Sequence, residues 1–322
     1  MANSKMLFIY LDKNILQYDC DGILKLETRD NLCFVYSEEH FNEISRSEDE
    51  RIFNVLQRIK ARKLKLTLDS KFNITDQPRM LDYQDPRMLY DEHQNATAGY
   101  KQYSNIFIPL QPFFMGNIES VDPHLINEKF VTQIKELMKS ISVTEIPQSL
   151  AANYEASLTN IGDNLEKALN DAKEKILPIE QMRKKFAKKN LSELNQSDGL
   201  IVDQIWSLVK DKFPGIEKDQ LFGKKPLPYM KIPEMPIFRT VVQCHSILNT
   251  LGYYPDKGLT KISKVYGINS DASHLAHSIF CSGIISADDH LCKKANAIFQ
   301  YLGLNKAVIQ LKFGKEDEKR IC

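Results

Sequence analysis

The chain has 322 residues, of which 43% are hydrophobic and 26% are charged, and its formal net charge is +1. This composition is typical of a soluble globular protein with one large or two modest domains, and it excludes a generally basic nucleic-acid coat protein. Six cysteines without a C-x-x-C pair indicate buried thiols in a cytoplasmic protein, not a disulfide framework or a zinc site. No segment approaches the roughly 18 apolar residues of a membrane span, so no membrane contact is expected.

The first 70 residues alternate between strand and helix patterns. Residues 6–11 and 32–36 are continuous apolar runs, as expected of strands buried on both faces. Ser37 follows the second run and is a good N-cap for a helix over EEHFNEISRS, and residues 49–60 have apolar side chains at helical spacing. Residues 62–69 alternate strictly, which predicts a half-exposed strand near a sheet edge, with Lys63 and Lys65 on its exposed face.

The middle of the chain loses this alternation. Residues 71–121 are rich in Asp, Asn, Gln, Pro and Tyr, and they are expected to be irregular and loop-rich. They contain a short repeat, PRMLDYQ and PRMLYDE, whose Arg and Tyr side chains are candidates for stacking on unpaired bases, or for a plain surface loop. Residues 122–236 are predicted to form a mainly helical insertion that ends in a Pro- and Gly-rich linker.

Alternation returns over residues 237–322. We expect helices at 237–251 and 289–301, closed by Gly252 and Gly303, a helix that begins near Asp271, and strands at 283–286 and 307–311. The sequence therefore predicts an α/β fold, in which a parallel-sheet domain made of residues 1–70 and 237–322 is interrupted by the segment between them.

Acidic residues stand where these strands end. Asp12 follows the first strand, Asp288 and Asp289 follow the strand at 283–286, Asp271 opens a predicted helix, and Glu43 lies on the helix after Ser37, with Glu39 one turn before it. The carboxyl ends of parallel strands share one edge of the sheet, so these side chains are expected to converge there. Two carboxylates about 4 Å apart repel by roughly 4 kcal/mol, so such a cluster must take up protons or bind a hard cation such as Mg²⁺ or Mn²⁺.

These motifs resemble those of PIN-domain nucleases. FIYLDKNIL is similar to the strand-Asp-x-Asn opening of that family, VYSEEHFNEI to its Ser-x-x-His-x-x-Glu helix, and DASHLAHSIFCSGIISADDHL to its aspartate-led helix and T-x-D-x-x-L signature. The resemblance covers about 150 of the 322 residues; the insertion is larger than the compact family core, and Ser286 stands where the family has Thr.

The resemblance implies a PIN-like three-layer domain and a function. The chain would be a Mg²⁺- or Mn²⁺-dependent endonuclease that hydrolyses phosphodiester bonds, most often in RNA, as a toxin or a defence effector. Asp12, Glu43, Asp271 and Asp288 would form the catalytic and metal-binding site, Glu43 by completing it or by orienting a water molecule. Its partners would be the RNA substrate and a protein inhibitor or a further copy of the chain. The hydrogen-bonding residues around the carboxylates would be Asn14, Ser286 and Asp289.

Other interpretations stay open. A basic run and Lys13 are candidates for nucleic-acid contact, although a solvated helix face explains the run equally well; the run consists of Arg183, Lys184, Lys185, Lys188 and Lys189. A catalytically silent PIN-like interaction module is the alternative function. A phosphatase of the haloacid-dehalogenase type is less favoured, because that class needs a second Asp where this chain has Asn14.

Overall fold

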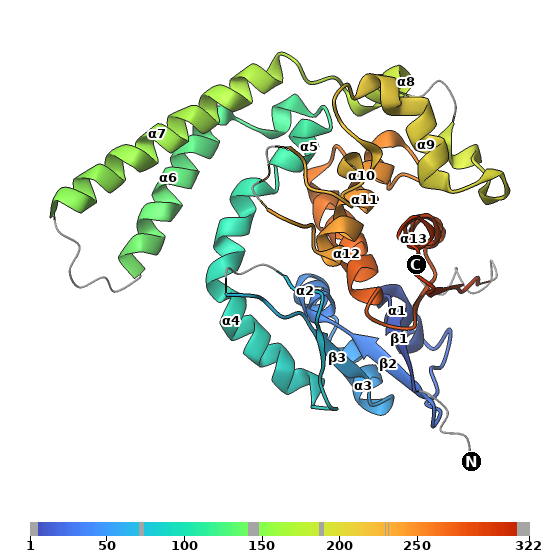
Figure 1. Cartoon of the computed structure of the whole chain (residues 1–322). Helices are drawn as coiled ribbons and strands as arrows, with labels where there is room; N and C mark the ends of the chain where they lie inside the picture. Colours follow the sequence, from blue (N-terminus) through green and yellow to red (C-terminus); the bar gives the residue numbers. More distant parts are fainter. Residues whose placement is uncertain are drawn as a thin grey trace. The chain divides into compact units, whose positions relative to one another are not determined.

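The computed structural model describes residues 6–70, 74–140, 148–186, 190–228, 230 and 232–313 (Figure 1). The chain divides into two compact units: the first contains residues 1–95, 183–256 and 267–322, and the second contains residues 96–182 and 257–266. The sequence predicts a loop-rich segment at 71–121 and a mainly helical insertion with a linker at 122–236, both outside the sheet domain. Residues 71–95 and 183–236 instead belong to the unit that contains the sheet.

The first unit is built on a six-stranded sheet with the order β4-β3-β2-β1-β5-β6. All neighbours are parallel except β3 and β4, which pair antiparallel. The strands are β1 (Leu7–Leu11), β2 (Leu32–Tyr36), β3 (Arg62–Lys65), β4 (Arg79–Met80), β5 (Gly283–Ser286) and β6 (Ala307–Gln310). The predicted α/β class and the parallel sheet are confirmed.

Successive side chains of the central strands point to opposite faces, and helices cover both. Tyr10, Val35 and Ile284 face one core, with α9 (Ile201–Val209), α11 (Ile237–Leu251), α12 (Ile262–Ser278) and α13 (Asp289–Tyr301). Ile9 and Phe34 face the other core, with α1 (Lys13–Cys20), α2 (Glu38–Ser47) and α3 (Arg51–Arg58). The unit is therefore a helix–sheet–helix sandwich, whose ligand edge lies at the carboxyl ends of the strands.

The second unit is helical. Its main elements are α5 (Leu110–Phe114), α6 (Pro123–Ser140) and α7 (Gln148–Lys173), and its core contains Phe113, Val121, Ile126 and Leu169. The helices α6 and α7 pack against each other, and a Cβ atom added at Gly162 of α7 would collide with the Asn127 side chain of α6. The remaining short helices of the chain are η1 (Ile118–Ser120), α8 (Ile179–Phe186), η2 (Leu191–Glu193), η3 (Gln196–Asp198), η4 (Lys210–Lys212) and α10 (Lys218–Leu221).

The expectation that residues 71–121 are irregular is wrong. The segment contains α4 (Pro86–Phe107), a helix of 22 residues. The sequence Asp85-Pro86 is a recognisable helix start. Asp85 accepts a hydrogen bond from the Arg87 amide at 2.9 Å, and Pro86 occupies the first helical position, where proline is favoured. The repeat is also not a unit of its own, since Arg87 pairs with Glu50 and Tyr90 packs on Phe53.

Residues 183–236, predicted as the end of the helical insertion and its linker, contain a helix of the sheet unit. Within them, α9 buries Ile201, Val202, Ile205 and Val209 in the core beside the sheet, because these side chains recur on one face of the helix. The predicted strand at 62–69 is also too long: β3 ends at Lys65, and Lys63 is 7% exposed because it pairs with Glu38 at 3.3 Å.

The C-terminal predictions are largely confirmed. The helix α11, with Gly252 as its left-handed C-cap, the strand β5 and the helix α13 have the predicted bounds, while β6 ends one residue earlier than predicted. One start is wrong, because α12 begins at Ile262 and Asp271 lies inside it. The helix continues through Gly267, and Ile268, Ala272, Leu275 and Ala276 maintain its buried face at helical spacing.

Candidate active site at the carboxyl edge of the sheet

Asp12 is the centre of a hydrogen-bonded group that joins β1 to β5. The residue is 5% exposed, and its backbone amide continues the ladder to Ile285 at 3.0 Å. Ser286 donates to Asp12 Oδ2 at 2.5 Å, and Asn14 Nδ2 donates to the same oxygen at 2.7 Å. Although Asp12 occupies the N-cap position of α1, its side chain makes no capping hydrogen bond. Its carboxylate is thus held toward the sheet edge and is not used to start the helix.

Asn14 and Ser286 also organise the loop after β5. Asn14 Oδ1 accepts from the Ala287 amide at 3.2 Å, and Ser286 Oγ accepts from the Asp288 amide at 3.0 Å. Both side chains therefore bind the carboxylate and the neighbouring backbone, which is the arrangement expected of residues that orient a functional group. The two positions were predicted in this role.

The two aspartates after β5 have different surroundings. Asp288 is the N-cap of α13, where its Oδ1 accepts from the Leu291 amide at 2.9 Å, and its charge raises the pKa of Asp12. Asp289 is exposed and accepts from Gln310 of β6 at 3.1 Å. Asp288 is therefore the one of the two that faces Asp12, and Asp289 contacts the neighbouring strand.

Asp271 reaches the same group from the middle of α12. Burial raises its pKa well above the ordinary value, and the charges of Asp12, Asp256 and Asp288 act in the same direction, while Lys294 opposes them. Burial also raises the pKa of Asp12, and the charges of Glu43 and Asp288 add to it. Glu43 and Asp288 thus lie near enough to raise the pKa of Asp12, and Asp12 and Asp288 lie near enough to raise that of Asp271.

Glu43 has a partner that the sequence did not predict. Its Oε2 lies 2.7 Å from Nε2 of the fully buried His274, whose Nδ1 lies 2.9 Å from the Tyr10 hydroxyl. Burial disfavours the charged imidazole, but the Glu43 carboxylate outweighs it and raises the pKa of His274 to about 9. In this charged form both ring nitrogens donate, and the imidazolium also lowers the pKa of Asp12. The i, i+3 spacing of Asp271 and His274 places both on one face of α12, but it does not indicate Glu43 as the partner of His274.

Glu39, which lies one turn before Glu43 on α2, has different partners. Its Oε1 accepts from Ser270 at 2.5 Å and lies 3.5 Å from Arg46. Burial works against ionisation of Glu39, yet the neighbouring His274 charge and the Ser270 hydrogen bond give it a lowered pKa. The choice of Glu43 as the acidic residue that faces Asp12 is consistent with these contacts.

A second polar group lies beside Asp271 and was missed entirely. Lys294 is fully buried, with its Nζ 2.5 Å from Asp256 Oδ1 and 3.2 Å from Asn249 Oδ1. Asn249 in turn donates to Asp256 Oδ2 at 2.6 Å. The ring of His245 is also buried, 4.0 Å from Asp256, and within the described residues neither of its nitrogens has a hydrogen-bond partner. A lysine at a helix position that reads as core was the only sequence signal.

The predicted nucleic-acid contacts are only in part available. Arg183 donates to the carbonyls of Asn249 and Thr250 at 2.7 and 3.1 Å, so it stabilises the last turn of α11. Lys184 and Lys185 are exposed and Lys13 is half-buried. Two further residues of the predicted run, Lys188 and Lys189, lie outside the described residues.

The described carboxylates do not form a protein cage for a metal ion. Across residues 6–313, apart from the gaps given above, no three His, Cys, Asp or Glu side chains converge closely enough to chelate a metal ion. Mg²⁺ commonly binds through one or two carboxylates and keeps several waters. Carboxylates that raise one another's pKa suit such an ion, because its charge relieves their repulsion.

Comparisons with known proteins give no assignment. No family model matches the chain, and no similar protein was found among the curated proteins or the solved structures. The resemblance to PIN nucleases therefore stays a prediction. In the described part of the chain, no helix has both the length and the apolar character that crossing a membrane requires.

Proposed function

We propose that the chain is a divalent-metal-dependent endonuclease of PIN type whose substrate is RNA. The observation that carries the proposal is Asp12, a buried carboxylate that follows a central strand without capping a helix and is fixed by Ser286 and Asn14. Its pKa is raised by burial and by neighbouring carboxylates. A buried cluster of like charges costs stability, and such arrangements are typical of functional sites.

Asp12 would hold Mg²⁺ or Mn²⁺ together with one neighbouring carboxylate, that of Asp271 or Asp288, and water molecules would supply the remaining ligands. The bound ion would activate water for attack on a phosphodiester and balance the charge on the phosphate. The chain's own residues do the positioning: Ser286 and Asn14 fix the Asp12 carboxylate, and the α13 amide of Leu291 fixes Asp288. Glu43, held by His274, would complete the acidic edge.

The test is cleavage of a labelled single-stranded RNA by the purified chain with Mg²⁺, with Mn²⁺ and with EDTA. We expect cleavage with either ion and none with EDTA, and loss of cleavage in the Asp12→Asn variant. A wild-type chain that does not cut RNA, and whose melting temperature does not rise with either ion, would contradict the proposal.

One observation favours a second function, a catalytically silent PIN-like interaction module. The His274–Glu43 pair at 2.7 Å already supplies the acidic edge with a resident positive charge. A silent module would show no metal-induced rise in melting temperature, so the same measurement separates the two functions.

A further inference from the structure

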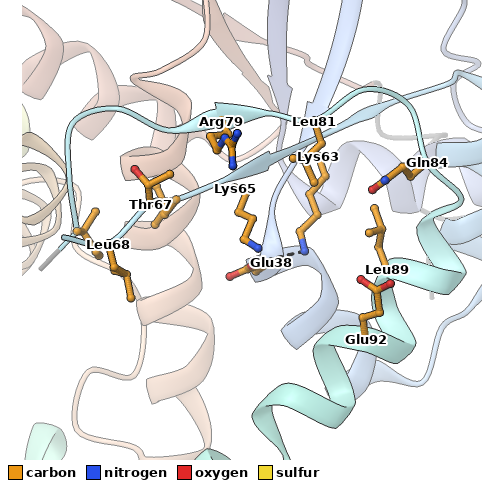
Figure 2. Close-up of a pocket in the computed structure, with 12 residues that line it drawn as sticks. Glu38, Lys63, Lys65, Thr67, Leu68, Arg79, Leu81, Gln84, Leu89 and Glu92 are labelled. Carbon is orange, nitrogen blue, oxygen red and sulfur yellow. Dashed lines mark ion pairs between the residues drawn. The ribbon is translucent and has the colours of Figure 1, made fainter. Parts of the chain in front are cut away.

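A pocket of about 800 Å³ opens at the end of the β3–β4 pair (Figure 2). Its walls come from β3, β4 and the chain that joins them, from the first turn of α2, and from the start of α4. Aliphatic side chains make up much of the lining, namely Leu66, Leu68, Ile74, Leu81 and Leu89. The pocket therefore offers an apolar surface with charged side chains around it.

Two like-charged side chains on the pocket wall lie directly opposite each other and repel. Lys65 of β3 and Arg79 of β4 are direct partners across the antiparallel pair, both are exposed, and both line the pocket. Like charges directly opposite one another destabilise a sheet. Within the described residues no carboxylate lies within ion-pair distance of either side chain, whereas the neighbouring Lys63 pairs with Glu38 at 3.3 Å. Because neither side chain has an ion-pair partner among the described residues, an anion bound between Lys65 and Arg79 would offset their repulsion.

The pocket lies on the same edge of the sheet as Asp12. Lys65 ends β3, Asp12 follows β1, and only β2 separates these two parallel strands. Two strand spacings amount to about 10 Å along the edge. Glu38, which lines the pocket, is the first residue of α2. The preceding residue, Ser37, forms a hydrogen bond with the Tyr10 hydroxyl at 2.7 Å. A chain lying along this edge would thus pass from the carboxylates to the pocket.

We propose that the pocket binds one unpaired nucleotide of the RNA strand, next to the cleavage position. Lys65 and Arg79 would contact its phosphate, and Leu68, 55% exposed, would contact its base. Unstacked bases with an accessible phosphate are the usual target of proteins that recognise single-stranded RNA. This inference rests on the proposed nuclease function for its choice of ligand.

The test measures binding without cleavage. A fluorescent single-stranded RNA is titrated in EDTA over a series of salt concentrations, with wild type and the double variant Lys65→Gln/Arg79→Gln. Two lost phosphate contacts should reduce the salt slope by about 1.4 and weaken binding about 25-fold at 0.1 M salt. The matched control is Lys25→Gln/Arg29→Gln, which removes the same charges from two exposed residues on the amino-terminal side of β2. It should bind RNA within about twofold of wild type.

The base contact is tested with Leu68→Ser, an exposed position whose change should leave the fold intact. This variant should lose affinity for RNA but not for inorganic polyphosphate, which has no bases. Unchanged RNA affinity in either pocket variant would overturn the inference, and so would loss of polyphosphate binding together with RNA in Leu68→Ser. If wild type does not cut RNA but the pocket variants still lose RNA binding, the nuclease proposal fails and the pocket stands. If wild type cuts and the pocket variants bind normally, only the pocket fails.

Discussion

The sheet unit contains two buried polar groups of opposite design. Around Asp12, the pKa of Asp12 is raised by Glu43 and Asp288 and that of Asp271 by Asp12 and Asp288, and the cations His274 and Lys294 only partly offset these effects. Around Asp256, one lysine and one asparagine satisfy one carboxylate through contacts of 2.5 and 2.6 Å. A balanced group is explained by structure alone, because breaking it leaves an unpaired charge. The unbalanced group is not explained by stability, and this difference is the main reason to assign function to Asp12.

The largest expected effect is on activity. Asp12→Asn and Asp288→Asn should each reduce RNA cleavage by about three orders of magnitude or more, because a misplaced cation neither activates water nor balances the phosphate. At position 12, the side-chain oxygen of Asn can still accept the hydrogen bond from Ser286. At position 288, Asn is as good an N-cap as Asp. Single-turnover rates at saturating Mg²⁺ measure the loss.

The control is Asp289→Asn, whose carboxylate contacts Gln310 and not Asp12. It should retain cleavage within about threefold, since an exposed charge is worth little. Retained cleavage in Asp12→Asn would show that the acidic group around Asp12 is not the catalytic site.

The next effect is on the balanced group. Lys294→Met leaves Asp256 buried without its cation, which should cost about 3–5 kcal/mol in free energy of unfolding. The double variant Lys294→Met/Asp256→Asn removes both charges and should recover much of that loss. Urea denaturation of the three proteins gives the comparison. If the double variant is as unstable as the single one, charge balance is not what holds this region.

Buried histidines of the sheet unit have pH responses of opposite sign, and one of them, His277, stacks on Tyr10 with ring centroids 6.1 Å apart, in the same region as His274. The pKa of His245 falls to about 3 and that of His277 to about 4, in both cases because burial disfavours the charged ring. Their folded pKa lies below the unfolded value of about 6.5, so stability falls as the pH drops below that value. His274 has a folded pKa of about 9, so its contribution is complete below about 6.5 and is lost as the pH rises through 9.

Melting temperatures from pH 4 to 10 should therefore decline on both sides. His274→Gln should flatten the alkaline side. His245→Leu should flatten the acid side and raise stability at neutral pH by about 1 kcal/mol, because it removes a buried ring whose nitrogens have no hydrogen-bond partner among the described residues. Identical profiles in wild type and both variants would show that other groups set the pH dependence.

The sheet was predictable from sequence because its strands are short apolar runs that end in recognisable residues. Asp12, Ser37, Gly252 and Asp288 marked boundaries that the structure confirms. The helix α4 was missed because its many polar residues obscure the helical spacing of its apolar residues, although Asp85 and Pro86 are a typical helix start. Residues 183–236 were predicted as the end of the helical insertion and its linker; that α9 packs in the sheet unit instead depends on tertiary packing.

Asp12 and Asp288 were predictable as acids at strand ends, whereas the position of Asp271 inside α12 and the partner of Glu43 were not. Ser286 and Asn14 bind Asp12, as the motif implied. The pairing of His274 with Glu43 joins α12 to α2 across 231 positions of sequence, and no local pattern carries such information. The same holds for Lys294 and Asp256, which lie 38 positions apart.

The smallest predicted effect separates the two polar groups by sign. In EDTA, Asp271→Asn should raise the melting temperature by about 2–4 °C, because it removes one of several repelling carboxylates and about 1 kcal/mol is worth that much in a chain of this size. The folded pKa of Asp271 is raised by burial first and then by Asp12, so its ionisation destabilises the fold, and the gain from Asn should grow as the pH rises. With Mg²⁺ or Mn²⁺ the sign should reverse, because wild type is then stabilised by the bound ion and the variant loses part of that stabilisation.

Asp256→Asn is the matched control: it breaks the pair with Lys294, and it should lower the melting temperature with and without metal. If Asp271→Asn lowers the metal-free value as Asp256→Asn does, the carboxylates around Asp12 are as balanced as those around Lys294, and their excess charge is no argument for a cation site.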